Sequence, residues 1–433
     1  MQSDWRGNQL NLSTRDILAW EKAEQEIESV RGGHLILRVV NAHGQPLAGV
    51  PVRHEQIAHD LGLGVHYPYD PAAYDAFQEV GINAATLWLG WSHVQPDPGR
   101  YNWGYLERVW SPCEMDKRGL RLTAHALNWF KPGWNVLPDY VKNTPIVDLP
   151  KRVYEHCGRI AQRWGRYIDV FEIVNEPFWA EAQAIEMPLE DMVRICHAAA
   201  LAIRDHAPDA RLQVSFAEVS RTPSYAVRPK DMLNALDEAD VPYDIVGLHS
   251  FENSYTVTEP PTFYRTKSFT GILQTLRQYT RPGKTVSISA LAVPSAPSTI
   301  KPPSRFKPPY GEWDEELQAQ YIDAAYTFFY AQQEVESITW WCPVDGHLSL
   351  IKGGGLLHED LSQKPAFATL RDWVARHTSK GQSYTDIEGK AQISGYAGNY
   401  GISIGSGAQG RAIERRIEAR MVHDHTVVLD YAP

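Results

Sequence analysis

The residues with the clearest chemical potential are Asn175 and Glu176, which end an apolar run and are followed by Pro177. A glutamate at the rim of a fold can give and take a proton as a general acid and base. A structural interpretation competes with this one, because Asn and Glu favour a first helical turn and Pro favours its first position. The elements around the motif must decide between the two.

Aromatic residues are the second candidate group, since the 433 residues include 14 Trp and 21 Tyr. Many aromatic side chains simply fill a core, but flat rings can also stack on the C–H faces of sugars. Position must decide between core and site. The candidates are Trp88, Trp91, Trp129 and Trp341, together with two histidines at expected strand ends, His125 and His249.

Eight short apolar runs alternate with amphipathic stretches such as 190–206, where Val193, Cys196, Ala200 and Ile203 keep near-helical spacing. Eight strands, each followed by a helix, predict a closed (β/α)8 TIM barrel. An open doubly wound sheet is the alternative, but no Gly-rich dinucleotide loop follows the first strand. The expected strands are 61–66, 84–89, 121–127, 168–174, 211–216, 243–248, 284–289 and 337–342.

Loop lengths indicate which end of this barrel carries a site. The turns from helix to strand are short, and several contain a glycine suited to ending a helix: Gly81, Gly119, Gly165 and Gly283. The loops from strand to helix are long, and the one after the seventh strand spans about 293–313. Long loops at the carboxyl ends of the strands are where such barrels build active sites.

The two ends of the chain have a different pattern. Residues 34–59 alternate like strands around a turn, and residues 379–433 alternate and are interrupted by glycines. We therefore predict a small β-sandwich-like module formed by both ends, a barrel over 60–378 and a lead-in segment over 1–33.

The charge of the chain limits the partners that we expect. The chain has 42 Lys and Arg against 52 Asp and Glu, which gives a net charge of -10. Nucleic acids and anionic membranes bind basic surfaces, so neither is expected as the main partner. No long apolar span, signal core or metal-ligand spacing is found, so we expect no membrane partner, metal or cofactor. Oligomeric state and compartment are not predicted.

The order of the motifs on successive strands resembles glycoside hydrolase family 10, or a divergent relative among the retaining barrels of its clan, loosely over 34–377. The motifs that carry this resemblance are Leu37–Val40 with Gly44–Gly49; His125, Leu127 and Trp129 with Pro132-Gly133-Trp134; Asn175-Glu176; Gly247-Leu248; Trp341 with Asp345; Leu356-Leu357; and Lys364-Pro365-Ala366.

The resemblance implies roles for these residues. Glu176 would be the acid/base catalyst after the fourth strand, and Asn175 would bind the sugar 2-hydroxyl. Carbohydrate would be the partner, contacted by residues of several strand ends and loops. These substrate-binding candidates are Asn175, His125, Trp129, Trp88, Trp91, Glu218, His249, Trp341 and Asp345.

Departures from the family pattern put plain xylan in doubt. The Glu-Asn-x-x-Lys-Trp pattern on the second strand is replaced by Thr86, Leu87 and Gly90 at its polar positions, and the Gln and His of the sixth strand correspond to His249 and Phe251. A site built from hydrogen-bonding groups discriminates strongly, so losing those groups should change the substrate.

Position 290 is the largest departure. Retaining hydrolysis needs two carboxyl groups about 5–5.5 Å apart, and the family's Thr-Glu-Leu-Asp corresponds to Ser289-Ala290-Leu291-Ala292. Alanine cannot attack an anomeric carbon. Three explanations stay open: an engineered exchange of the nucleophile for Ala, a natural carbohydrate-binding barrel without catalysis, or another nucleophile such as Glu218 or Glu252.

The expected function is a retaining O-glycoside hydrolase acting on a poly- or oligosaccharide other than plain xylan, with its nucleophile position occupied by Ala290. The alternative from a different class is a carbohydrate-binding barrel without catalysis. A barrel enzyme of unrelated chemistry is disfavoured, since no phosphate-type Gly loop or metal ligands are evident.

Overall fold

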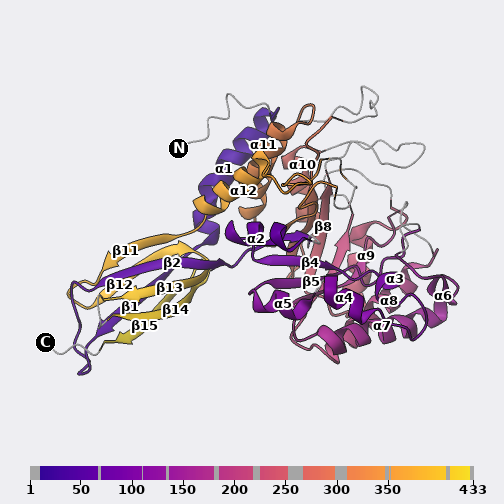
Figure 1. The fold of residues 1–433 in the computed structure, drawn as a ribbon, viewed down its shortest axis with the longest axis horizontal. Coiled ribbons are helices and arrows are strands. Elements are labelled where there is room, and N and C mark those ends of the chain that lie inside the picture. The colour runs from indigo at the N-terminus through magenta and orange to yellow at the C-terminus, as the bar shows by residue number, and fades with distance from the viewer. Residues whose placement is uncertain are drawn as a thin grey trace.

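The computed structural model describes residues 10–66, 70–109, 111–132, 136–179, 185–217, 225–251, 267–297, 310–346, 351, 353–405 and 410–429. Within this part of the chain, eight parallel strands close into a barrel in the order β10-β3-β4-β5-β6-β7-β8-β9, with helices outside it (Figure 1). The predicted (β/α)8 barrel is confirmed. Its strands are β3 (Gly62–His66), β4 (Ala84–Trp88), β5 (Arg121–His125), β6 (Val170–Asn175), β7 (Arg211–Phe216), β8 (Ile245–Phe251), β9 (Thr285–Ala292) and β10 (Val335–Trp340).

The predicted strands differ from the observed ones mainly at their ends. β9 was expected to end at residue 289, but it continues through Ala290 and Leu291 to Ala292. These residues are buried and pair with β8 on one side and β10 on the other, which keeps them extended. Position 290 therefore lies within a strand and not in a loop.

The helices cover the outside of the barrel. Gly81, Gly119 and Gly283 have positive φ angles, as expected for glycines that end helices. Gly165 differs, because its φ of -56° is helical and an added Cβ would lie 2.7 Å from the Cβ of Ala207. In the described residues, no helix is both long and apolar enough to cross a membrane.

The helices around the barrel are α2 (Pro71–Glu79), α3 (Trp91–Val94), α4 (Trp103–Val109), α5 (Pro112–Lys117), α6 (Asp139–Lys142), the 3-10 helix η2 (Ile146–Asp148), α7 (Leu149–Trp164), α8 (Leu189–Arg204), α9 (Pro229–Glu238), α10 (Phe269–Tyr279), α11 (Glu315–Tyr330) and α12 (Pro365–Arg376).

Both ends of the chain build the second part of the molecule, which lies beside the barrel (Figure 1). One sheet has the order β12-β1-β15 and the other β11-β2-β13-β14, so each contains one N-terminal strand. Leu37 of β1 and Ile402 of β13 belong to one buried cluster that both sheets share. The expected β-rich module is confirmed. Its strands are β1 (Gly32–Val40), β2 (Pro51–His59), β11 (Lys380–Tyr384), β12 (Lys390–Tyr396), β13 (Gly398–Ile404), β14 (Arg411–Ile417) and β15 (Val422–Val428).

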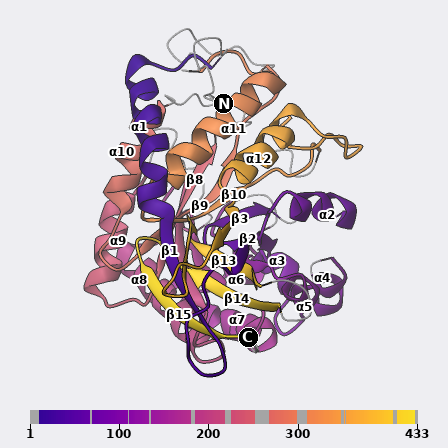
Figure 2. The same cartoon turned by 90° about the vertical axis from the view of Figure 1, so that its left-hand side faces the viewer.

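The lead-in segment contains a helix, α1 (Thr14–Arg31), that lies along α10 and α11 (Figure 2). Its first turn is capped by Ser13, whose side chain accepts a hydrogen bond from the Asp16 amide. The Asp16 carboxylate in turn accepts one from the Thr270 amide of α10. The segment therefore packs on the barrel before the chain enters β1.

Candidate active site

The carboxyl ends of the barrel strands bring most of the predicted site residues into one mouth. The strand-end side chains are mainly aromatic, imidazole and amide groups, which suit a polar ligand with flat faces. The last residues of the eight strands are His66, Trp88, His125, Asn175, Phe216, Phe251, Ala292 and Trp340.

Glu176 follows β6 directly and is almost fully buried. Its amide donates to the Ser215 carbonyl oxygen at 2.8 Å, and its Oε1 accepts a hydrogen bond from His249 Nδ1 at 2.8 Å. Its φ of 47° lies in the left-handed region, which costs a non-glycine residue about 1–3 kcal/mol. No helix starts here, since α8 begins only at Leu189, so the interpretation of the motif as a helix cap is wrong.

The electrostatics around Glu176 favour its ionised form. Burial raises the pKa of its carboxyl, but the hydrogen bond and charge of His249 and the charges of Lys131 and His125 outweigh burial and bring the pKa below its usual value. A general acid needs the opposite shift, toward the working pH. As it stands, Glu176 is placed as a hydrogen-bond acceptor.

Removing the charge of the imidazole should weaken this shift. In His249→Gln the amide can still donate a hydrogen bond but carries no charge, so the pKa of Glu176 should rise from its depressed value. Titration of ¹³C-labelled glutamate side chains by NMR would measure this, with the Glu176 signal assigned through Glu176→Gln.

His54→Gln in the distant β2 is the matched control and should leave the Glu176 titration unchanged. In the parent protein the depressed pKa means that ionised Glu176 stabilises the fold near neutral pH, and that this contribution is lost as the pH falls through the carboxyl range. A Glu176 pKa that stays low in His249→Gln would contradict the assignment of the shift to His249.

Ala290 faces the mouth beside His249. Gly247 and His249 of β8 are two positions apart, whereas their partners in β9, Ser287 and Ala290, are three positions apart. The extra residue in β9 forms a bulge. Paired residues of neighbouring parallel strands point to the same face of a sheet, and His249 reaches the mouth because it contacts Glu176. Position 290 therefore presents a buried methyl group next to the Glu176–His249 pair.

Trp341 lies at the centre of a ring cluster on the floor of the mouth. Its ring centroid is 4.5 Å from that of His66, 4.8 Å from His125 and 6.5 Å from His249. Phe251 lies 6.4 Å away, nearly perpendicular to it. The structure thus joins Trp341 to both histidines that the sequence analysis singled out.

A second aromatic group lies beside this cluster. Trp88 is 5.5 Å from the His125 ring and 6.0 Å from the Trp129 ring, measured between centroids. The Lys131 ammonium lies 5.1 Å from the centroid of Trp129 and 4.5 Å from that of Trp179. Trp88 and Trp129 are therefore neighbours of the mouth and continue its aromatic surface.

Two predicted site residues have other contacts. Trp91 in α3 stacks on His156 with centroids 4.1 Å apart, and its indole donates to the Tyr140 hydroxyl at 2.9 Å. Asp345 lies 2.6 Å from the buried Lys364 ammonium and accepts a hydrogen bond from the Gly355 amide. These contacts favour positioning roles for both residues, and substrate contact by either one stays a prediction.

Some predicted residues lie outside the part of the chain that the structure describes. They are Glu218 and Glu252, the alternative nucleophiles of the sequence analysis, and Gly133 and Trp134. The part of the loop after β9 from 298 to 309 lies outside it as well. Their roles stay predictions.

The model of Glycosyl hydrolase family 10 matches residues 78–373, which is more than half of the chain. The chain belongs to this family. The predicted resemblance is confirmed. Asn175 ends β6, the fourth strand of the barrel in chain order, and Glu176 follows it, but the acid/base role of this pair stays a prediction.

Relatives of the family agree on the fold at low sequence identity. A curated endo-1,4-beta-xylanase A from Phanerodontia chrysosporium is 23% identical over 223 residues, which are 49% of this chain and 50% of that relative. The chain thus matches about half the length of that protein. A solved endo-1,4-beta-xylanase from Caldicellulosiruptor owensensis covers 72% of this chain and 96% of its own, with a TM-score of 0.51 and 16% identity. A family 10 endoxylanase from a sugarcane soil metagenome covers 72% and 97%, with a TM-score of 0.55 and 18% identity.

The polar grip that the resemblance predicts on the second strand is absent from this chain. Thr86 lies in β4 and faces a cavity at the opposite end of the barrel from the mouth, and the Leu87 side chain is fully buried. A Cβ added at Gly90 would lie 3.1 Å from the Trp88 indole nitrogen, so the indole occupies the space beside this glycine. An aromatic ring therefore stands next to the position where the resemblance predicts a lysine.

The sequence analysis missed His66 and Glu172. His66 is fully buried, and its ring is in contact with Trp341. Glu172 lies deeper in β6, where it is bonded to His125 Nδ1 at 2.9–3.0 Å and to Ser215 Oγ at 2.6 Å. Two signals in the sequence could have indicated these residues. His66 ends the first expected barrel strand, and Glu172 is a charged residue within a mostly apolar strand.

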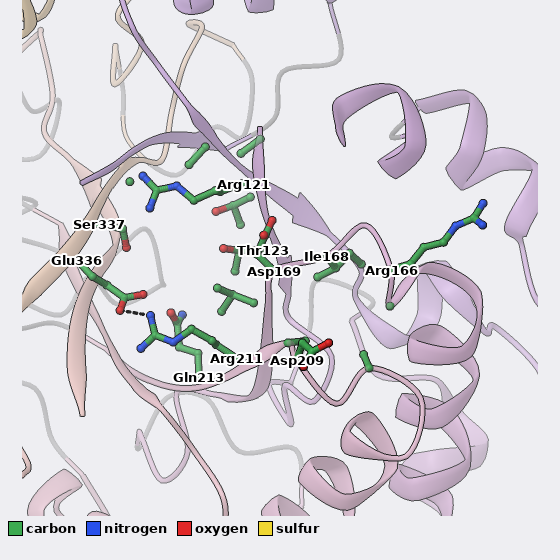
Figure 3. Close-up of a pocket in the computed structure, with 18 of the residues that line it drawn as sticks. Arg121, Thr123, Arg166, Ile168, Asp169, Asp209, Arg211, Gln213, Glu336 and Ser337 are labelled. Atoms are coloured by element: carbon green, nitrogen blue, oxygen red, sulfur yellow. Dashed lines mark hydrogen bonds and ion pairs between the residues drawn. The ribbon is translucent and has the colours of Figure 1, made fainter. Parts of the chain in front are cut away.

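A cavity of about 660 Å³ lies at the opposite end of the barrel (Figure 3). Its lining comes from the first residues of the strands, including Gly62, Arg121 and Arg211, and the Arg211–Glu336 ion pair lies within it. None of the predicted site residues lines it. Because barrel enzymes bind substrates at the carboxyl ends of their strands, we do not place the ligand of the family here.

Proposed function

We propose that this protein binds a carbohydrate chain at the mouth of its barrel and, with its present residues, does not hydrolyse that chain through a glycosyl-enzyme. The observation that carries this proposal is β9, where Ala290 and Ala292 stand in register with His249 and Phe251 of β8. Methyl groups occupy the strand end from which a family 10 nucleophile would act. Family membership and the ring-lined mouth support carbohydrate as the ligand.

Buried polar atoms support a ligand rich in hydroxyl groups. Among the described residues, several such atoms at the mouth have no hydrogen-bond partner within the protein: Asn175 Oδ1, Glu176 Oε2 and Trp341 Nε1. Buried polar groups are nearly always hydrogen-bonded, and leaving one unpaired costs about 1–3 kcal/mol. A sugar can satisfy both donors and acceptors while its C–H face contacts the rings.

The contacts of Glu176 are compatible with a bound sugar. The hydrogen bond and charge of His249 bring the pKa of its carboxyl below the usual value, so the carboxylate can accept a hydrogen bond from a sugar hydroxyl. On the second strand, Thr86, Leu87 and Gly90 stand where the resemblance predicts polar residues that bind xylan. This difference supports a ligand other than plain xylan.

A retaining hydrolase inactivated at one position is the second candidate. Retention of Asn175-Glu176, with Glu176 in a strained conformation, favours it. One engineered exchange would account for Ala290 but not for Ala292, whose family counterpart is also acidic. We therefore place natural binding first.

A glycan panel tests the proposed function. Oligosaccharides of different backbones would be screened for binding by calorimetry, and each mixture would be analysed for products by chromatography. We expect saturable binding of at least one oligosaccharide at one site per chain, without products. Absence of binding across the panel, or rapid release of products by the unmodified chain, would overturn the proposal.

A further inference from the structure

Two hydrogen-bond acceptors at the mouth lack a donor. Asn175 Oδ1 and Glu176 Oε2 have no hydrogen-bond partner within the described part of the protein, and the two residues are only 2% and 6% exposed. They are adjacent in the chain, since Asn175 ends β6 and Glu176 follows it. A buried acceptor without a partner costs about 1–3 kcal/mol. A ligand that stabilises this site must therefore bring donors to both atoms.

The carboxylate of Glu176 keeps its negative charge in this arrangement. A neutral imidazole that donates from Nδ1 of His249 satisfies Oε1 at 2.8 Å, but it does not cancel the charge. Glu172, a second carboxylate, is fully buried and bonded to His125 in the same way. Lys131 is a nearby ammonium whose charge acts on Glu176. With neutral imidazoles the two carboxylates outnumber this ammonium, so this described part of the mouth is negative.

An ammonium group on the ligand matches these features better than a hydroxyl group does. It has three N–H donors and no acceptor, so one group can donate to Asn175 Oδ1 and Glu176 Oε2 together, whereas a hydroxyl has a single donor. Its hydrogen bond to an ionised carboxylate is charge-assisted, which makes it roughly twice as strong as a neutral one. The rings of Trp88 and Trp341, which both contact His125, attract a cation as well.

We propose that the ligand of this mouth is an oligosaccharide of amino sugars with free amino groups, and that the ammonium at C2 of one sugar donates to Glu176 Oε2 and Asn175 Oδ1. This inference rests on the proposed carbohydrate-binding function and narrows its ligand class. The position C2 follows from the sequence analysis, which predicts contact between Asn175 and the substituent at that carbon. The net charge of -10 of the whole chain also favours the approach of a cationic oligosaccharide.

A matched series of trisaccharides that differ only at C2 tests the inference. The β-1,4-linked trimers of glucosamine, glucose and N-acetylglucosamine carry an ammonium, a hydroxyl and an acetamido group there on the same backbone. Calorimetry at slightly acidic pH, where the amines are protonated, would measure each affinity. We expect the glucosamine trimer to bind at least about 10-fold more tightly than the glucose trimer, as one hydrogen bond to a charged group allows. The acetylated trimer, which is uncharged at C2, should show no such gain.

Exchange of the carboxylate assigns the preference to Glu176. Glu176→Gln keeps the shape of the side chain and removes its charge, so it should weaken binding of the glucosamine trimer far more than binding of the glucose trimer and abolish the preference. Glu55→Gln on the exposed face of β2 makes the same exchange away from the mouth and should change nothing. Circular dichroism would show that both variants are folded.

The outcomes separate this inference from the proposed function. If the glucose or the acetylated trimer binds as tightly as the glucosamine trimer, or the preference survives in Glu176→Gln, this inference is wrong while the proposed function stands. The same holds if another oligosaccharide of the panel binds and the glucosamine trimer does not. If no oligosaccharide binds, the proposed function itself fails.

Discussion

Ala290→Glu is expected to give the protein retaining glycosidase activity on an activated aryl glycoside, with a rate at least about 1,000-fold above that of the unmodified chain, or about 4 kcal/mol of barrier. The reason is geometric. Position 290 is in register with His249, and His249 Nδ1 lies 2.8 Å from the Glu176 carboxylate. A carboxylate added there would lie in the mouth next to the Glu176–His249 pair, and two-carboxylate hydrolysis needs two carboxyl groups about 5–5.5 Å apart.

Release of the chromophore measures the rate, and NMR of the first-formed sugar shows whether the anomeric configuration is retained. Ala290→Gln has nearly the same size without the nucleophile and should stay inactive. Ala290→Glu combined with Glu176→Gln should lose activity on substrates with poor leaving groups, because only those need a proton. If Ala290→Glu remains inactive on every glycoside that the protein binds, position 290 is not the nucleophile position.

Trp341→Ala is expected to weaken oligosaccharide binding by about 30-fold or more, which corresponds to roughly 2 kcal/mol for removing a central aromatic contact. Trp341 is placed for this effect because His66, His125 and His249 all pack around its ring. Without the indole the floor of the mouth is lost, and the imidazoles that hold Glu172 and Glu176 lose a common neighbour. Calorimetric titration with the best oligosaccharide of the panel measures the loss.

Trp341→Phe separates binding from folding, since it keeps one aromatic ring in the cluster and removes the pyrrole part of the indole with its nitrogen. It should bind within a few-fold of the parent protein, and circular dichroism should show both variants folded. Unchanged binding by a folded Trp341→Ala protein would remove this cluster from the binding site.

Much of the fold could be predicted because local patterns determine it. Each barrel strand is a short apolar run, so all eight were found, and the alternation of 34–59 and 379–433 indicated the second module. The end of β9 was missed because two alanines carry no strand signal. Pairing with β8 and β10, which a single sequence does not reveal, keeps Ala290 and Ala292 extended.

The site could be predicted only in part. Asn175 and Glu176 form a motif of adjacent residues, so the sequence indicated them directly. The Glu176–His249 pair joins residues 73 positions apart, and its charge effect on Glu176 depends on that contact. Likewise, the stacking of Trp91 on His156 behind the mouth depends on how α3 and α7 pack, which no residue pattern encodes.

The most direct test of the central claim is to follow binding and cleavage of one oligosaccharide by the unmodified protein. The best ligand of the panel would be titrated by calorimetry and then incubated with the protein in H₂¹⁸O, with mass spectrometry detecting any product that has gained ¹⁸O. The account predicts one-site binding that Trp341→Ala weakens, and no labelled product. Labelled product that accumulates at an ordinary enzymatic rate of about 1 s⁻¹ or faster would contradict it.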